Sequence, residues 1–377
     1  MDIARWVTIL VLLYALFGLI KLLRAYLRTK ETRFLLLGSL LFLVFLDASV
    51  VLYGSIPAAF MNFHYVVMLV PLAVYVFSIY LEKRQSNELS EEVLIRNAFQ
   101  PYVSAQALAE LLSNKSKLKL GGERRLLSVL YCDIQSFKSL TEKMSPEAVV
   151  HLLNVYLSDM SEIVLQADGV LDKYVGDGLW AFWGAPLSEE DHALLSCQAA
   201  LSMVKRVKQV QPVWDKKGFP RVNLQVGINT GKSIVGNLGS SKRFDYSVWG
   251  YQARLAKFLA RLNKVYGTRI LLSESVVEKV AENFVFREVD LVSWGKKRPV
   301  RVYELLGEKD KKFDGFLAVY QSALTAYRHR EWFKARSLFE EALKLKKGDG
   351  VCHVYLERVK SFVLSPPPKD WDGVMAL

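Results

Sequence analysis

Apolar residues are concentrated in the first eighty positions of this chain of 377 residues. Three apolar stretches, residues 7–23, 34–53 and 60–81, each come close to the roughly 20 residues that cross a bilayer as a helix. They predict an all-α membrane region of three helices over residues 1–81. A cleaved signal peptide is the alternative for the first stretch, but Lys21 and Arg24 stand at its end, where a small-residue cleavage site is expected.

The loops between these stretches differ in charge. Residues 54–59 carry none, whereas the first loop carries five basic residues, Lys21, Arg24, Arg28, Lys30 and Arg33. Because basic loops stay on the cytoplasmic side, we expect a multi-pass protein with its amino terminus outside and everything after residue 84 in the cytoplasm. Asp47 lies inside the second stretch, where a carboxylate is costly unless it is paired or neutral. It is either part of an ion or ligand site with His64 or a protonated, packed aspartate.

After the membrane region the pattern changes to short alternating elements. Residues 82–122 are polar and helix-prone, with a break at Pro101, and are typical of a signalling linker. Residues 123–308 interleave helices with strands, some in hairpins, which predicts an α+β or mixed α/β domain around one sheet. The expected helices are 146–167, capped by Ser145, 192–210 and the segment after Gly250. The expected strands are LLSVLYCDI, a pair around Gly176 and Asp177, VNLQVGI, DYSVW, RILLSE and RPVRVYELL.

The helix after Gly250 carries two stripes. Leucines at 255, 259 and 262 form an apolar one, and a neighbouring charged stripe contains Arg254, Lys257 and Arg261, with Phe258 between the two. The charged stripe is either a solvated face or a face turned toward a substrate.

Residues 309–377 change character again. Alanine, leucine and aromatic residues recur at helical spacing over 313–363, a pattern that resembles one tetratricopeptide-like α-helical hairpin plus a further helix. One such unit cannot bury its own faces, so we expect it to dock on the preceding domain or on a partner. The end, SPPPKDWDGVMAL, is expected to be irregular, with Trp371 as its anchor.

Charge and cysteine usage exclude some functions. Cys132, Cys197 and Cys352 are far apart, which suggests neither a zinc site nor a disulfide framework. The formal net charge is +12, but the basic residues are dispersed without a recognition motif, which argues against nucleic acid as a partner. Lipid of the anionic inner leaflet is the simpler partner for this charge.

Two carboxylates end strands where the chain turns, Asp133 in LYCDIQSF and Asp177 in KYVGDG. Hard cations such as magnesium prefer carboxylate oxygens and leave positions open for phosphates. Aspartates are common in turns, so the sequence around these two must show whether they bind a metal. VLYCDIQSFKSLTE, KYVGDGLWAFWGAP, GINTGKSIVGNLGSSKRFDYSVWG and LARLNKVYGTRILLSE occur in this order with the spacing of one family. Over residues 120–306 the chain resembles the class III adenylate and guanylate cyclases, and the segment before it and the tail resemble those of bacterial membrane cyclases.

The resemblance implies a ferredoxin-like α+β catalytic domain, a head-to-tail dimer with sites at its interface, and two Mg²⁺ or Mn²⁺ ions. One ion would polarise the ribose 3′-hydroxyl of ATP for attack on the α-phosphate, giving cyclic AMP and pyrophosphate. By motif position Asp133, Asp177 and the backbone carbonyl of Ile134 are the metal ligands. The amides around Phe137 hold phosphate oxygens, as helix starts do.

Base recognition is implied at Lys173 and Ser247 of the partner subunit. Lysine can donate to adenine N1, and a hydroxyl can accept from the exocyclic amine, whereas guanine presents the opposite pattern. A serine hydroxyl can also donate, so Ser247 discriminates less firmly than a carboxylate. A solvated lysine at the strand edge is the simple alternative for Lys173.

The second half of the family pattern is altered. Arg254 stands where the family has asparagine and Phe258 where it has arginine, the two residues that stabilise the transition state. Arg254 or Arg261 can bring positive charge back, since a guanidinium side chain spans about the 5.4 Å of a helical turn; we favour Arg254. The Val292 to Lys297 turn is one residue shorter than the family's, so a triphosphate-binding role falls on Lys296 or Lys297, with Lys296 preferred.

The sequence thus predicts an adenylate cyclase anchored in the bacterial cytoplasmic (inner) membrane, acting in intracellular signal transduction as a homodimer. The alternative is a non-catalytic cyclase-like domain that binds nucleotide and signals by dimerisation, or one that needs a heterodimer with another cyclase chain. A purely structural adaptor leaves Asp133, Lys173 and Asp177 unexplained.

Overall fold

The computed structural model describes residues 120–240, 244–294 and 298–376, with a few isolated positions before them. The chain divides into two compact units, Met1–Ile95 and Arg96–Leu377. The three predicted membrane helices and most of the predicted linker lie outside the described residues. Among those that are described, one helix, Pro146–Gln166, is long and apolar enough to cross a membrane. Four of its side chains are buried, and they pack against the sheet described next.

The described residues form one mixed sheet of nine strands in the order β2-β3-β1-β4-β6-β8-β7-β9, with β5 paired to β4. Two pairs are parallel, β4 with β6 and β7 with β9, and the others are antiparallel. The strands are β1 Gly121–Ile134, β2 Val170–Val175, β3 Gly178–Trp183, β4 Leu224–Gly239, β5 Phe244–Trp249, β6 Ile270–Ser273, β7 Phe284–Ser293, β8 Val300–Glu308 and β9 Met375–Ala376. This is the mixed α+β sheet that the sequence predicted.

Eight helices lie in the described residues: α5 Phe137–Thr141, α6 Pro146–Gln166, α7 His192–Lys216, α8 Tyr251–Tyr266, α9 Glu274–Val280, α10 Asp314–Arg328, α11 Trp332–Leu345 and α12 Gly350–Leu364. The Ser145 hydroxyl accepts a hydrogen bond from the amide of Ala148 at 3.3 Å, so the predicted cap of α6 is correct. The predicted end of α7 at residue 210 is wrong. The helix continues through Pro212 because Trp214, which is only 3% exposed, anchors its last turns in the core.

Two strands are longer than predicted. β1 begins at Gly121 rather than at Leu126, and β4 continues through the polar sequence up to Gly239. The reason is pairing on both sides, because β4 pairs with β1 from Leu224 to Asn237 and with β5 from Ile234 to Gly239. Backbone partners of this kind are invisible in the local polarity pattern.

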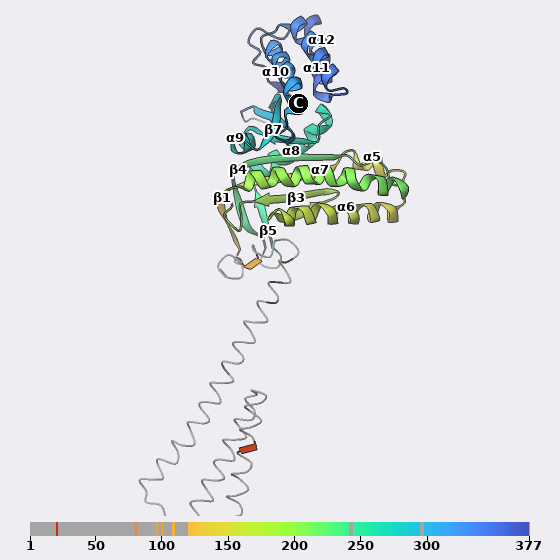
Figure 1. The fold of residues 1–377 in the computed structure, drawn as a ribbon. Helices are drawn as coiled ribbons and strands as arrows, with labels where there is room; N and C mark the ends of the chain where they lie inside the picture. Colours follow the sequence, from red (N-terminus) through yellow and green to blue (C-terminus); the bar gives the residue numbers. More distant parts are fainter. Residues whose placement is uncertain are drawn as a thin grey trace, which may run out of the picture. The chain divides into compact units, whose positions relative to one another are not determined.

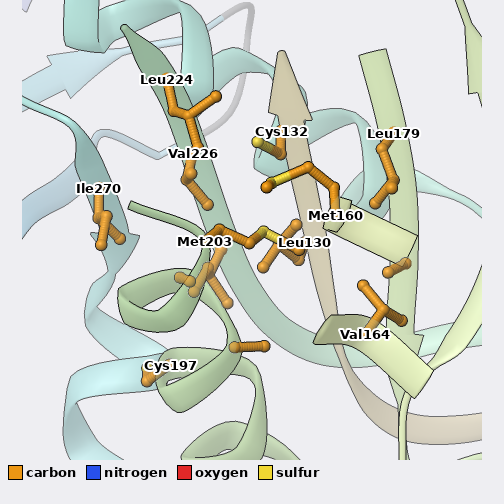
Figure 2. Close-up of a cluster of buried hydrophobic side chains, with 14 of the residues drawn as sticks. Leu130, Cys132, Met160, Val164, Leu179, Cys197, Met203, Leu224, Val226 and Ile270 are labelled. Atoms are coloured by element: carbon orange, nitrogen blue, oxygen red, sulfur yellow. The ribbon is translucent and has the colours of Figure 1, made fainter. Parts of the chain in front are cut away.

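Strand alternation on β1 separates two layers. Leu130 and Cys132 face α6 and α7, which cover one side of the sheet (Figures 1 and 2). Val129 and Tyr131 face the other side, where α8 packs with small residues such as Ala256. A side chain at Gly227 of β4 would collide with the backbone of α8, so this glycine allows the helix to lie directly on the sheet. Continuing the alternation, Asp133 points to the α8 side.

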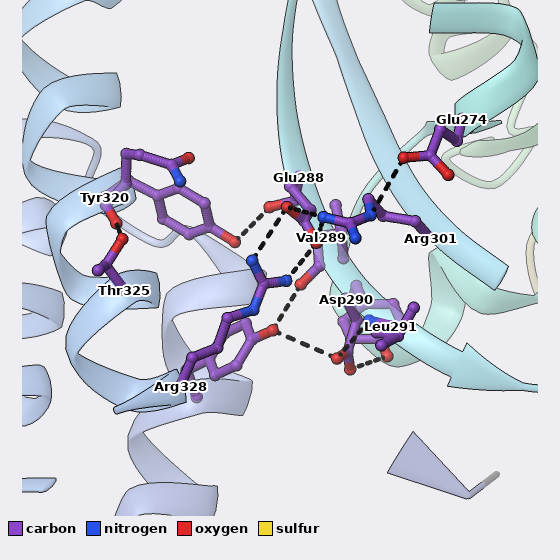
Figure 3. A network of polar contacts seen from close by, with 12 residues as sticks. Glu274, Glu288, Val289, Asp290, Leu291, Arg301, Tyr320, Thr325 and Arg328 are labelled. Carbon is purple, nitrogen blue, oxygen red and sulfur yellow. Dashed lines mark hydrogen bonds and ion pairs between the residues drawn. The ribbon is translucent and has the colours of Figure 1, made fainter. Parts of the chain in front are cut away.

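The C-terminal helices α10 to α12 pack on the α+β domain that precedes them. They share one buried apolar cluster with the leucine stripe of α8 and with β7. Polar contacts follow the same junction (Figure 3): Tyr320 donates to the carbonyl of Glu288 at 2.8 Å, and Arg328 binds the Glu288 carboxylate. Docking on the preceding domain is therefore the arrangement that the structure shows, while the likeness to a tetratricopeptide hairpin stays a prediction.

The chain's end is more regular than predicted. Trp371 is an anchor as expected, because its ring packs against those of Tyr327 and Phe362. Beyond it, β9 pairs in parallel with β7, with Met375 opposite Val292. β9 forms because the edge of β7 offers its backbone as a partner. The composition of the last residues alone did not reveal this pairing.

Candidate active site

The two predicted metal carboxylates lie together at one end of the sheet. Asp133 is near the end of β1, and Asp177 is in the tight turn between β2 and β3. Because β3 pairs with β1, with Leu179 opposite Cys132, the turn returns to the end of β1. The amide of Ile134 donates to Oδ2 of Asp177 at 2.9 Å, which fixes this carboxylate beside the other.

The electrostatics of the pair suit a divalent cation. Burial and the neighbouring Asp177 raise the pKa of Asp133 to about 6, and burial also raises the pKa of Asp177. Oδ1 of Asp133 is buried without a hydrogen-bond partner in the described part of the chain. An unpaired buried carboxylate oxygen beside a second carboxylate is a pair of hard donors for Mg²⁺ or Mn²⁺. Among the described residues, no group of three or more His, Cys, Asp or Glu side chains is placed to hold a metal ion.

The loop after Asp133 is strained. Ser136 has φ 56° and ψ 35°, the left-handed region that residues other than glycine rarely adopt. Phe137 follows as the first residue of α5, and its half-buried ring packs against the core under α6 and α7. The structure therefore places Phe137 where the sequence predicted it, directly after the carboxylate loop.

The two predicted base-reading residues are hydrogen-bonded to each other. Nζ of Lys173 donates to Oγ of Ser247 at 3.0 Å. Ser247 in turn donates to Oδ2 of Asp172 at 3.0 Å, and Oδ1 of Asp172 lies 3.3 Å from Nζ of Lys173. Sequence reasoning missed Asp172. Its signal was an acidic residue inside an apolar strand, but the register shift between Leu171 and Lys173 that turns it inward is a property of the sheet.

The charged stripe of α8 divides into two parts. The predicted leucine stripe is buried, while Arg254 and Arg261 are exposed. The side chain of Arg254 makes no hydrogen bond or ion pair with the residues that the structure describes, and it is free to meet a ligand. Lys257 is turned the other way: its Nζ lies 4.9 Å from the centre of the Tyr131 ring, under the carboxylate pair.

The sequence placed Lys257 in the charged stripe of this helix but assigned it no role in the site. Its ammonium lowers the pKa of both Asp133 and Asp177. Arg261 acts in the same direction on Asp133. The Lys257 ammonium thus supplies a cation to the carboxylate pair of its own chain. The sequence could not reveal this, because it does not show which side of the sheet α8 covers.

Phe258, at the family's arginine position, has a packing role. Its ring stacks on Trp294 with centroids 5.2 Å apart and an interplanar angle of 20°. The ring of Tyr251, the first residue of α8, also packs against Trp294, with centroids 5.0 Å apart. Phe258, Tyr251 and Trp294 therefore form one aromatic cluster, which joins α8 to the end of β7. The remaining predicted residue, Lys296, lies outside the described residues.

Comparison with known proteins identifies the family of the α+β domain. The model of the adenylate and guanylate cyclase catalytic domain matches residues 123–318. The chain belongs to this family. The class III cyclase resemblance drawn from the four motifs is thereby confirmed.

Individual relatives agree with this assignment. Adenylate cyclase 1 of Rhizobium meliloti is 31% identical over 185 residues, and the adenylate cyclase of Anabaena cylindrica is 32% identical over 186 residues. These matches cover 49% and 48% of this class III cyclase chain, but only 28% and 37% of the relatives' own lengths. Among solved structures, the adenylyl cyclase CyaB of P. aeruginosa is 30% identical, with a TM-score of 0.47, covering 50% of this chain and 98% of that one.

Proposed function

We propose that this protein is a membrane-anchored adenylate cyclase that converts ATP to cyclic AMP and pyrophosphate at a dimer interface. The observation that carries the proposal is the carboxylate pair Asp133 and Asp177, with its unpaired buried oxygen at the end of β1. The curated relatives reported above are named adenylate cyclases, which supports the same reaction. The predicted location in the bacterial inner membrane, with inner-leaflet lipid around it, is part of this proposal.

The carboxylates would hold two Mg²⁺ or Mn²⁺ ions together with the carbonyl of Ile134. When bound, the ions polarise the ribose 3′-hydroxyl and neutralise charge on the phosphates. The chain's own contribution is orientation: the Ile134 amide fixes one oxygen of Asp177. Among the residues that the structure describes, Oδ1 of Asp133 has no hydrogen-bond partner and can accept a cation.

Base selection falls to Lys173 and Ser247, whose side chains are already joined. Lysine donates to adenine N1, and the serine oxygen accepts from the exocyclic amine. In a head-to-tail dimer this pair faces the carboxylates of the partner subunit. Each chain then supplies metal ligands to one site and base readers to the other.

Arg254 neutralises the negative charge that builds up on the reacting phosphates. The amides around Phe137 and the Lys296 ammonium hold phosphate oxygens. The support for Arg254 is its exposed guanidinium on α8, which has no partner among the residues that the structure describes. A preorganised donor aimed at developing charge contributes about 10² to 10³ in rate. Loss of this side chain is therefore expected to lower turnover within that range.

The test uses the full chain in lipid nanodiscs with Mn-ATP, measuring cyclic AMP. Asp133→Ala serves as the blank, and Arg221→Ala is a matched control because this arginine is also exposed but lies before β4. Product that depends on Asp133 is the expected result, and its absence contradicts the cyclase proposal. Equal rates for wild type and Arg254→Ala contradict the role of Arg254 alone.

The aromatic cluster supports a second candidate function. Because Phe258 is committed to Trp294, one chain paired with itself lacks the family's arginine in both sites. A nucleotide-binding partner that completes a heterodimer, or signals without turnover, fits this observation. Binding of ATP without product in the homodimer, followed by activity on adding a cyclase chain that carries the family's asparagine and arginine, would favour this function.

A further inference from the structure

The base-reading pair has a buried third member, Asp172. Its side chain is 1% exposed, and the Ser247 residue is 2% exposed. Asp172 is the residue at which the register of β2 against β3 shifts, so Asp172 and Lys173 both reach Ser247 on β5. The three side chains are joined by two hydrogen bonds and an ion pair, each between 3.0 and 3.3 Å.

The hydrogen bonds fix the direction in which Ser247 can act. A serine hydroxyl has one proton to donate and two lone pairs that accept. The proton goes to Oδ2 of Asp172, and one lone pair receives a proton of the Lys173 ammonium. One lone pair remains, so toward a base in this site Ser247 can only accept.

We propose that Asp172 is a specificity-determining positioning residue, which makes Ser247 an obligate acceptor and so selects adenine over guanine. Adenine presents an amine donor at C6, whereas guanine presents a carbonyl acceptor there. Guanine would therefore place an acceptor against an acceptor, while its N1–H would meet the Lys173 donor. The proposal rests on the nucleotide site described under the proposed function and removes the ambiguity of a serine that donates as well as accepts.

The surroundings keep Asp172 in its acceptor role. Burial raises the pKa of Asp172, and the Lys173 ammonium and the Ser247 hydroxyl both oppose this rise. Reorienting the Ser247 hydroxyl toward guanine would leave the buried Oδ2 without its donor, a loss that buried groups resist. Guanine is thus rejected for two reasons. It would face an acceptor on Ser247, and turning the Ser247 hydroxyl toward it would leave the Asp172 carboxylate without its donor.

The experiment measures binding of 3′-deoxy-ATP and 3′-deoxy-GTP to the full chain in nanodiscs with Mn²⁺. Both probes lack the attacking hydroxyl, so no turnover interferes. The variants are Asp172→Asn, Ser247→Ala and the double variant, with Asp168→Asn as a matched control in the exposed turn before β2. We expect the wild type and Asp168→Asn to prefer the adenine probe, and Asp172→Asn to lower the preference by about tenfold.

A residue that acts through Ser247 leaves a signature in the double variant. Asp172→Asn is expected to change the preference little when Ser247 is already alanine. Ser247→Ala leaves the buried carboxylate in place and alone must reduce the preference, so this variant decides the matter if Asp172→Asn does not fold. An unchanged preference in either single variant, or an undiminished Asp172→Asn effect in the alanine background, overturns the inference while the nucleotide site stands. A wild type that binds neither probe overturns both.

Discussion

Replacing Asp133 by asparagine is expected to stabilise the metal-free protein at neutral pH while it abolishes metal binding. The reason is that the folded protein holds this carboxylate, half-buried, beside Asp177 without a hydrogen-bond partner for Oδ1 among the described residues. Asparagine has nearly the same shape and no charge, so it removes the repulsion without creating a cavity. A functional carboxylate of this kind trades stability for ligand affinity.

The magnitude follows from the pKa. Burial and Asp177 raise the pKa of Asp133 from 3.8 to about 6, which makes ionisation in the folded state costlier by about 3 kcal/mol. Solvent reaches part of the side chain and screens its charge, so we expect a gain of about 1 to 2 kcal/mol. The unfolded chain loses this proton near pH 4 and the folded chain near pH 6. The penalty therefore grows as pH rises through this interval, is complete above it, and vanishes below it.

The assay is thermal unfolding of the full chain with EDTA, at neutral pH and near pH 4, with Asp245→Asn as an exposed control of the same chemistry. Asp133→Asn should melt higher than wild type at neutral pH, and the two should converge in acid. A variant that is less stable at neutral pH, or equally stabilised at both pH values, refutes the reasoning about buried charge. Mn²⁺ should raise the melting temperature of wild type only.

Three further predictions concern the same site. Ser136→Gly is expected to stabilise the protein by up to about 1 kcal/mol, because glycine tolerates φ 56°, whereas Ser139→Gly inside α5 should destabilise it; urea denaturation of the two compares them, and a loss at position 136 argues against strain. Lys257→Ala should tighten Mn²⁺ binding without nucleotide severalfold, read by electron paramagnetic resonance, since a cation leaves the carboxylate pair; weaker binding contradicts this. Phe258→Leu and Trp294→Leu should show a coupling free energy of about 1 kcal/mol in a double-mutant cycle of unfolding, and additive effects would show that the stack contributes nothing.

Local patterns were sufficient for much of the fold and half of the site. The helix cap at Ser145, the hairpin around Asp177 and the leucine stripe of α8 depend on neighbours in sequence, and all three are present. The meeting of Lys173 with Ser247 followed from the order of the family motifs. These features were predictable because the residues that determine them lie within one element or one motif.

The remainder depends on contacts between distant segments. The length of β4 is set by pairing with β1 and β5, and the passage of α7 through Pro212 by the burial of Trp214. The inward turn of Asp172 comes from an irregular register against β3. The position of Lys257 under the carboxylates depends on how closely α8 approaches the sheet, which the bare backbone of a glycine in β4 permits. None of these partners is near its counterpart in sequence.

The junction between α8 and the last helices changes what a truncation would mean. Tyr266, the last residue of α8, donates to Asp290 at 2.6 Å, and Arg358 of α12 binds the same carboxylate at 2.6 Å. Cutting the chain at residue 308, where the sequence suggests a domain border, would strip the cover from the helix that carries Arg254. An inactive truncated protein would then report a catalytic helix that has lost its backing, and it would say nothing about a missing regulatory signal. The helices of the last seventy residues thus form part of the packing that supports α8.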